Sequence, residues 1–321
     1  MKILALIVKP FIDMVRVMMR KSALLIFSIL GAAMIVSSAF AADSANVRIS
    51  ILADDTAMSD KYLAEHAVSI LVELPNGHRW LVDTGTTSVF MENAQRMGAN
   101  LDNLSGIVIS HGHDDHAGGL LFYPRLKGKP PIYGHPFIWH KSYEAKAGEP
   151  VRVIGIPYLA RKYAAPSFHP VNNTAKLDDG LFFFTDIPRP AGSFVASGGK
   201  FFNEDLTGPD PIIDDATVVI KTPRGLVVIF GCGHAGYTNI LKAIHKEFPN
   251  EKILSVIGGL HLVLGKDKDL EEAVAYTNSI KADDFSFYGG HCTGDKAIKY
   301  FKEKLGEKAI HPMGSGRVIT F

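Results

Sequence analysis

Residues 111–116, His-Gly-His-Asp-Asp-His, place three imidazoles and two carboxylates directly after the apolar run 106–110. In an extended or irregular segment, residues two apart project the same way, so His111 and His113 can share one cation. Asp115 and His116 follow at once and can serve a second cation or assist the first. Imidazole and carboxylate groups together suit zinc, manganese or iron. Asp114 lies between the required positions, so we expect it to face solvent or to support a ligand.

Three later histidines each follow a β-like run that ends near a glycine: His234, His261 and His291. The carboxyl ends of successive parallel strands meet at one edge of a sheet, where α/β proteins tend to bind their ligands. We therefore expect all three imidazoles to approach the segment 111–116. This convergence predicts a site with enough ligands for two metal ions.

The elements that must position these side chains fall into two halves of the chain. The first half predicts a helix at 89–98 and strands at 47–53, 67–74, 78–85, 106–110 and 130–136. The second half predicts helices at 238–248, 269–280 and 295–305, with strands at 180–187, 216–222, 225–231, 252–259, 284–290 and 317–321. This pattern suits two sheets packed together with helices outside.

Between the two halves, the residues near 140–205 are predicted to form an insertion or a wrapping loop that lines the pocket. Residues 140–180 are rich in Pro, Lys and Asn and have weak periodicity. Residues 192–208 carry aromatic side chains and several glycines, which suit a surface connection, with a lid as the alternative. Substrate specificity is expected to reside in this part of the chain.

The composition argues for a small-molecule substrate. The chain has 321 residues, 47% of them hydrophobic, and a formal net charge of +1. A near-neutral charge gives no electrostatic reason to expect nucleic acid or an anionic membrane as the main partner. The two cysteines, Cys232 and Cys292, are too few for a disulfide framework. One bridge between them, metal ligation, and burial in tight turns all stay open, as does a homodimer.

The start of the chain has the pattern of a secretory signal. Basic residues precede the apolar run 22–38, and Ala39-Phe40-Ala41 supplies a small-x-small cleavage site. We therefore expect a signal peptide at 1–41 and a folded domain at 42–321, with no membrane span after cleavage. An uncleaved membrane anchor is the alternative. Either way the folded part is expected outside the cytoplasm, in the periplasm if the organism is Gram-negative.

The motifs together resemble the metallo-β-lactamase superfamily, whose signature is His-x-His-x-Asp-His after a strand. Here the pattern is matched by His111, His113, Asp115 and His116, and Leu-Val-Asp-Thr-Gly at 81–85 resembles the first motif. The chain is similar to the branch labelled 7,8-dihydropterin-6-methyl-4-(β-D-ribofuranosyl)aminobenzene-5′-phosphate synthase-like. The resemblance covers residue 60 to the C-terminus, with an interruption near 140–180, and is carried by the segments SHGHDDHAGGL, DIPR, GCGHAG, GGLHL and GHCTG.

This resemblance implies an α/β fold, a four-layer αββα sandwich of two mixed β-sheets with helices on the outer faces. It implies two divalent metal ions, zinc first, with manganese or iron as alternatives. Asp83 would orient the metal loop by supporting a ligand. The metal ligands would be His111, His113, Asp115, His116, His234 and His291.

The chain departs from the superfamily pattern at two ligands. A bridging Asp is usual after the strand that here precedes Gly-Cys-Gly-His, so His234 would act as a terminal ligand instead. A mid-chain His has no clear match, and the candidates are His135, His140, His169 and Asp186.

The resemblance also implies hydrolysis. Metal-activated water would attack an ester, thioester, lactone, phosphoester or β-lactam. Asp115 would orient the water and accept its proton, and His261 would protonate a leaving group or stabilise an oxyanion. Arg189 would hold an anionic group of the substrate.

Two other classes of function stay open. One is a non-catalytic, metal-containing binding or sensor protein that keeps the fold. The other is a di-iron redox protein, although His113 stands where those relatives usually carry a Glu, and no flavin-binding segment follows.

Overall fold

The computed structural model describes residues 46–145, 148–196 and 201–321. The signal peptide predicted at 1–41 lies outside the described residues. Contacts divide the chain into Met1–Asn46 and Val47–Phe321, and every helix and strand of the described residues belongs to the second unit. Among the residues described, no helix has the length and apolar character needed to cross a membrane.

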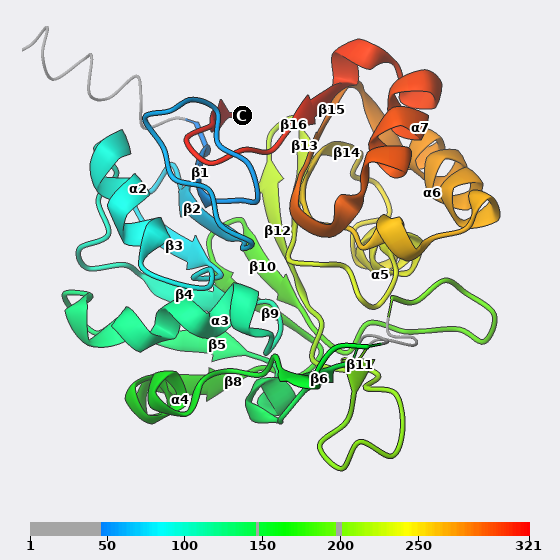
Figure 1. The fold of residues 1–321 in the computed structure, drawn as a ribbon. Coiled ribbons are helices and arrows are strands. Elements are labelled where there is room, and N and C mark those ends of the chain that lie inside the picture. Colours follow the sequence, from blue (N-terminus) through cyan, green and yellow to red (C-terminus); the bar gives the residue numbers. More distant parts are fainter. Residues whose placement is uncertain (1–45, 146–147, 197–200) are drawn as a thin grey trace, which may run out of the picture. The chain divides into compact units, whose positions relative to one another are not determined.

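Two seven-stranded sheets form the centre of the unit (Figure 1). The first sheet has the order β17 (Val318–Thr320), β1 (Arg48–Ala53), β2 (Ser69–Glu73), β3 (Arg79–Val82), β4 (Gly106–Ile109), β5 (Ile132–Gly134) and β8 (Phe168–Pro170). The second has the order β16 (Ile310–Pro312), β15 (Lys281–Gly289), β14 (Ile253–Gly258), β13 (Gly225–Phe230), β12 (Thr217–Thr222), β10 (Leu181–Phe184) and β9 (Thr174–Asp178). Both are mixed: in the second, β12 and β13 are antiparallel, whereas β13 through β16 are parallel.

Side-chain alternation along the strands explains why the two sheets pack face to face. On β13, Val227 and Ile229 belong to the core between the sheets, while Leu226, Val228 and Phe230 pack under the helices of the second sheet. A strand buried on both faces therefore reads as a continuous apolar run. Each fully buried aliphatic side chain of this kind contributes roughly 1.5–3 kcal/mol by leaving water.

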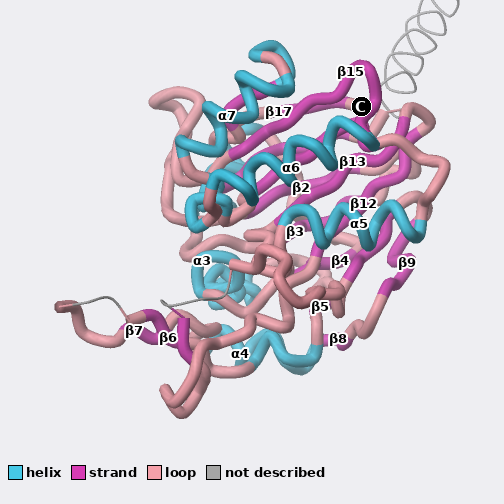
Figure 2. Tube along the Cα trace, turned by 90° about the vertical axis from the view of Figure 1, so that its right-hand side faces the viewer, coloured by secondary structure: helices cyan, strands magenta, loops and turns pink. Residues whose placement is uncertain are grey.

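Helices cover the outer face of each sheet. The second sheet is covered by α5 (Tyr237–Glu247), α6 (Asp267–Ile280) and α7 (Asp295–Leu305), which run across it in Figure 2. The first sheet packs against α2 (Val89–Met97) and α4 (Tyr158–Ala164), with the short α3 (Asp114–Ala117) beside them. The order helix, sheet, sheet, helix confirms the predicted αββα sandwich.

The segment near 140–205 is more regular than the predicted loop. It supplies α4 and the edge strands β8 and β9. It also supplies all three strands of a small third sheet, in the order β11 (Phe201–Phe202), β6 (Tyr143–Glu144) and β7 (Arg152–Val153). Strands of two or three residues carry no readable alternation, so only their pairing partners reveal them.

Candidate metal centre

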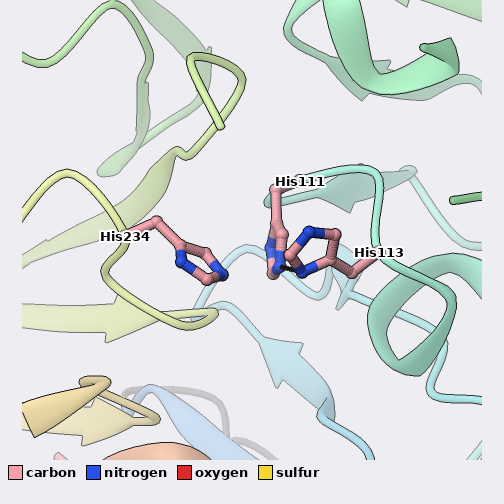
Figure 3. Close-up of side chains that lie close together, drawn as sticks. All are labelled: His111, His113 and His234. Atoms are coloured by element: carbon pink, nitrogen blue, oxygen red, sulfur yellow. Dashed lines mark hydrogen bonds between the residues drawn. The ribbon is translucent and has the colours of Figure 1, made fainter. Parts of the chain in front are cut away.

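The first group of candidate ligands is made by His111, His113 and His234, whose donor atoms all lie within 4.8 Å of one another. His111 and His113 come from the segment after β4, and His234 faces them from the turn after β13 (Figure 3). His111 Nε2 lies 3.0 Å from His113 Nδ1. Burial lowers the pKa of His113 to about 4 and holds those of His111 and His234 well below their usual range. All three are therefore neutral at pH 7, the state that binds cations.

The second group is made by Asp115, His116 and His291. Asp115 Oδ2 lies 3.3 Å from His291 Nε2 and 3.9 Å from His116 Nε2, and the two imidazole nitrogens are 3.4 Å apart. Burial alone would raise the pKa of Asp115, but the neighbouring His116 and His291 outweigh it and hold the pKa well below its usual range. The group thus combines one carboxylate with two imidazoles.

These donors fit metal ions. In a tetrahedral site with ligand distances near 2.1 Å, neighbouring ligand atoms are about 3.4 Å apart, close to the spacings observed in the second group. In the first group, His234 Nδ1 donates to Ala196 O at 2.7 Å, which leaves the Nε2 lone pair directed inward. This Nε2 is buried and has no hydrogen-bond partner among the described residues. A cation would supply the missing partner.

Asp83 supports the second group from behind. The carboxylate is buried at the end of β3 and accepts three hydrogen bonds, each of 2.7 Å, from Ser110 N, Ser110 Oγ and His116 Nδ1. The bond to Nδ1–H fixes the tautomer of His116 and leaves Nε2 free to bind. Gly119 lets the ligand segment pack this closely, since a Cβ there would lie 2.1 Å from Thr84 O.

The two cysteines are free thiols beside both groups. Cys232 Sγ lies 3.1 Å from His116 Nε2, and together with His111 these atoms form a further set within 4.8 Å. Cys292 Sγ lies 3.3 Å from Cys232 Sγ. Cys232 follows β13, at the position where the superfamily usually carries a bridging Asp. Its sulfur is near one ligand of each group.

His261 lies beside the first group at the end of β14. Its ring centroid is 4.3 Å from that of His234, and its backbone N–H donates to Cys292 Sγ at 3.3 Å. The backbone is left-handed with φ +46°, an uncommon conformation for a residue with a Cβ. Its Nδ1 is buried without a hydrogen-bond partner among the described residues.

A cavity of about 260 Å³ opens onto the centre. Its walls include Asp115, His261 and His291 together with Arg152, Ile154 and Phe201. Asp114 also lines it instead of facing bulk solvent, and burial together with the charge of Asp115 raises the pKa of Asp114 to about 6. Phe201 belongs to the residues expected as a surface connection, so that segment contributes to the pocket.

The structure places Arg189 away from this cavity. Its guanidinium donates to the backbone carbonyls of Pro211 and Ile212, a structural use of the side chain. The arginine that lines the cavity is Arg152, on β7. The predicted substrate-binding role of Arg189 is not supported by this placement.

The four mid-chain candidates also lie elsewhere. His135 Nε2 pairs with Asp186 at 3.2 Å, His140 Nε2 pairs with Asp210 at 3.0 Å, and His169 stacks on Tyr133. None of them belongs to a ligand group found among the described residues. The third imidazole of the first group is supplied by His234.

Sequence reasoning missed four residues around the centre. Asp214 accepts a hydrogen bond from Gly112 N and Asp215 from Ala235 N, so these buried carboxylates hold both ligand segments. Asp55 and His66 lie beside His291. The Asp-Asp pairs at 54–55 and 214–215 lie next to predicted strands, but they have no fixed spacing to the histidines. For this reason the sequence alone does not place them in the site.

Comparisons with known proteins agree with this centre. The sequence model of the Metallo-beta-lactamase superfamily matches residues 64–238. The chain is 26% identical, over 295 residues, to the 7,8-dihydropterin-6-methyl-4-(beta-D-ribofuranosyl)-aminobenzene-5'-phosphate synthase of Methanocaldococcus jannaschii, covering 86% of this chain and 97% of that one. It is 29% identical over 255 residues to an uncharacterised protein of the same organism, covering 78% of this chain and 92% of that one.

Among solved structures, Tm1679, described as a metal-dependent hydrolase of the beta-lactamase superfamily, aligns with a TM-score of 0.72 and 31% identity. The alignment covers 85% of this chain and 98% of that one. The family match spans more than half of the chain, and the fold and ligand groups agree with it. The chain therefore belongs to the metallo-β-lactamase superfamily and is similar to the synthase-like branch that its motifs indicate.

Proposed function

We propose that this protein is an exported, metal-dependent hydrolase that acts on a small anionic substrate. The observation that carries the proposal is the convergence of two separate ligand groups at the floor of one open cavity. The basic and apolar start of the chain supports export. The relative from Methanocaldococcus jannaschii is named a synthase, so the reaction class is the part of the proposal that most needs a direct test.

Two divalent cations, zinc in the first instance, would be held by the two groups. Cations in such sites lower the pKa of water and polarise a carbonyl or phosphoryl oxygen. Asp115 lines the cavity as a carboxylate and would orient the attacking water. His261 also lines the cavity, where it would protonate the leaving group.

Cys232 takes the place of the missing carboxylate bridge in this proposal. Its sulfur is near both His111 and His116, which belong to different ligand groups. A thiolate is a strong ligand for zinc and can be shared between two sites. Burial raises the pKa of the Cys232 thiol well above its usual range, so a bound cation would be needed to make it an anionic donor between the groups.

Arg152 replaces Arg189 as the proposed anion-binding residue. It is half-exposed at the cavity, and its guanidinium lies 3.4 Å from Glu144 and 3.8 Å from Asp114. These two carboxylates hold the side chain at the cavity wall. Arginine suits a carboxylate or a phosphate because its planar fork can donate two hydrogen bonds. The synthase relative is named for a compound that carries a 5'-phosphate, and this supports a substrate with a phosphate group.

Replacing Arg152 with alanine should raise KM for an anionic ester by about 10- to 100-fold, the value of one charge-assisted hydrogen bond. The kcat should change little because Arg152 belongs to neither ligand group. Steady-state kinetics with charged and neutral esters measure the effect. Arg224→Ala is the matched control, since Arg224 is similarly exposed and pairs with Asp284 outside the cavity. Equal loss with neutral and anionic esters would contradict the assignment.

The function itself is tested with the purified mature protein. About two zinc or manganese ions per chain, together with hydrolysis of a phosphodiester, thioester or lactone, are the expected results. Elemental analysis and a substrate panel after metal reconstitution measure both. Bound iron with oxygen uptake would point to the redox alternative, and full metal content without turnover on the panel would point to the binding protein.

A further inference from the structure

A third histidine stands at the second ligand group, outside the superfamily signature. His66 lies in the connection between β1 and β2, and its ring stacks on that of His291 with centroids 4.5 Å apart. The side chain of His291 is buried, whereas that of His66 is 61% exposed at the mouth of the cavity. His291 is therefore the buried member of this stacked pair, and His66 is the member at the entrance of the cavity.

Asp55 holds both imidazoles in the same way. Its Oδ1 lies 2.8 Å from His291 Nδ1, and its Oδ2 lies 2.9 Å from His66 Nδ1. A carboxylate at Nδ1 fixes the proton on that nitrogen, so Nε2 keeps its lone pair for a cation. One residue thus prepares His66 and His291 for the same chemistry.

The Nε2 atoms of both residues converge on a single oxygen. His66 Nε2 and His291 Nε2 each lie 3.3 Å from Asp115 Oδ2. In this tautomer both nitrogens are acceptors, and the carboxylate oxygen is an acceptor as well. Lone pairs on two nitrogens and an oxygen placed this way need a positive charge between them, which either a proton or a cation can supply.

The backbone around His66 is fixed, so this placement does not depend on the exposed side chain alone. Thr86 Oγ1 donates to His66 O at 2.6 Å, and Ala67 N donates to Asp55 Oδ1 at 3.3 Å. Glu65 accepts from Thr87 Oγ1 at 2.6 Å. Residues 65–67 are thereby tied to the segment that follows β3.

We propose that His66 is a further protein ligand of the cation position formed by Asp115, His116 and His291. The inference rests on the proposed function only in requiring that this position holds a divalent cation. Because His66 is at the entrance, it closes the cation position on its solvent side. This cation position should therefore have more protein ligands than the position in the first group. There the imidazole nitrogens of three histidines converge.

Zinc binding to metal-free protein tests the proposal, with chelator competition as the readout. For His66→Ala, the affinity of one of the two zinc equivalents should fall by about 10- to 100-fold or more, while the other is unchanged. His66→Gln should give a smaller loss, because an amide can still offer an oxygen. Cobalt substituted at this position should show a changed absorption spectrum in both variants.

His78→Ala is the matched control. His78 is 55% exposed and pairs through Nδ1 with Asp178 at 2.7 Å, as His66 pairs with Asp55, but it is on the opposite end of β3 from the centre. It should bind both zinc equivalents like the wild-type protein. Two equivalents bound at wild-type affinity by His66→Ala would overturn the proposal, even if substrate binding became weaker. A wild-type protein that binds no zinc tightly would instead overturn the proposed function.

Discussion

Replacing His116 with alanine should remove one cation per chain and lower kcat/KM by about 10³-fold or more, which corresponds to roughly 4 kcal/mol of transition-state stabilisation. His116 Nε2 lies 3.1 Å from Cys232 Sγ and 3.4 Å from His291 Nε2, so its loss opens the second ligand group. The side chain is fully buried, but it makes its contacts with polar ligands and not with the apolar core. The protein should therefore remain folded.

Elemental analysis, kinetics and circular dichroism of His116→Ala separate these effects. His78→Ala again serves as the control, because it removes an imidazole outside the centre. A His116→Ala protein that keeps wild-type metal content would be incompatible with the second ligand group. A protein that loses its secondary structure would show instead that His116 is needed for folding.

Replacing Asp83 with asparagine should weaken zinc binding by about 10- to 100-fold, although Asp83 is not a ligand in either group. Asp83 Oδ2 accepts from both Ser110 Oγ and His116 Nδ1. An amide nitrogen at this position would face these two donors. The hydroxyl can rotate away, but His116 can respond only by moving its proton to Nε2, which is the atom that must bind the cation.

The same substitution should lower the free energy of unfolding by about 3 kcal/mol, because buried hydrogen-bonded charges lose partners on both sides. Chelator competition and chemical denaturation measure the two effects. Asp102→Asn provides the control, since Asp102 is an exposed carboxylate paired with Lys127. Unchanged zinc affinity in Asp83→Asn would show that the tautomer of His116 is set by another group.

The sequence could predict the parts of the centre that depend on local order. His111, His113, Asp115 and His116 share one short segment, so their spacing alone brought them together. His234 and His291 could be placed because each follows a strand, and β13 to β15 are parallel neighbours. The long strands were readable because they are apolar on both faces.

The remaining parts depend on tertiary contacts that no local pattern records. Asp55 and His66 are in an irregular connection, where nothing in the spacing points toward His291. Arg152 reaches the cavity because the two-residue strand β7 pairs with β6, whereas Arg189 is drawn to the carbonyls of Pro211 and Ile212. Choosing between two arginines required the register of strands too short to be predicted.

The small third sheet is joined by main-chain bonds to the segment that carries the ligands. Asp114 N donates to Ile154 O at 2.6 Å, and His113 pairs with Gly155 as an isolated bridge. An insertion or deletion in this sheet would therefore shift His113 together with the cavity wall. Divergence toward new substrates should proceed in this architecture by exchanging side chains such as Arg152 and Ile154, while the length of the strand that bears them is conserved.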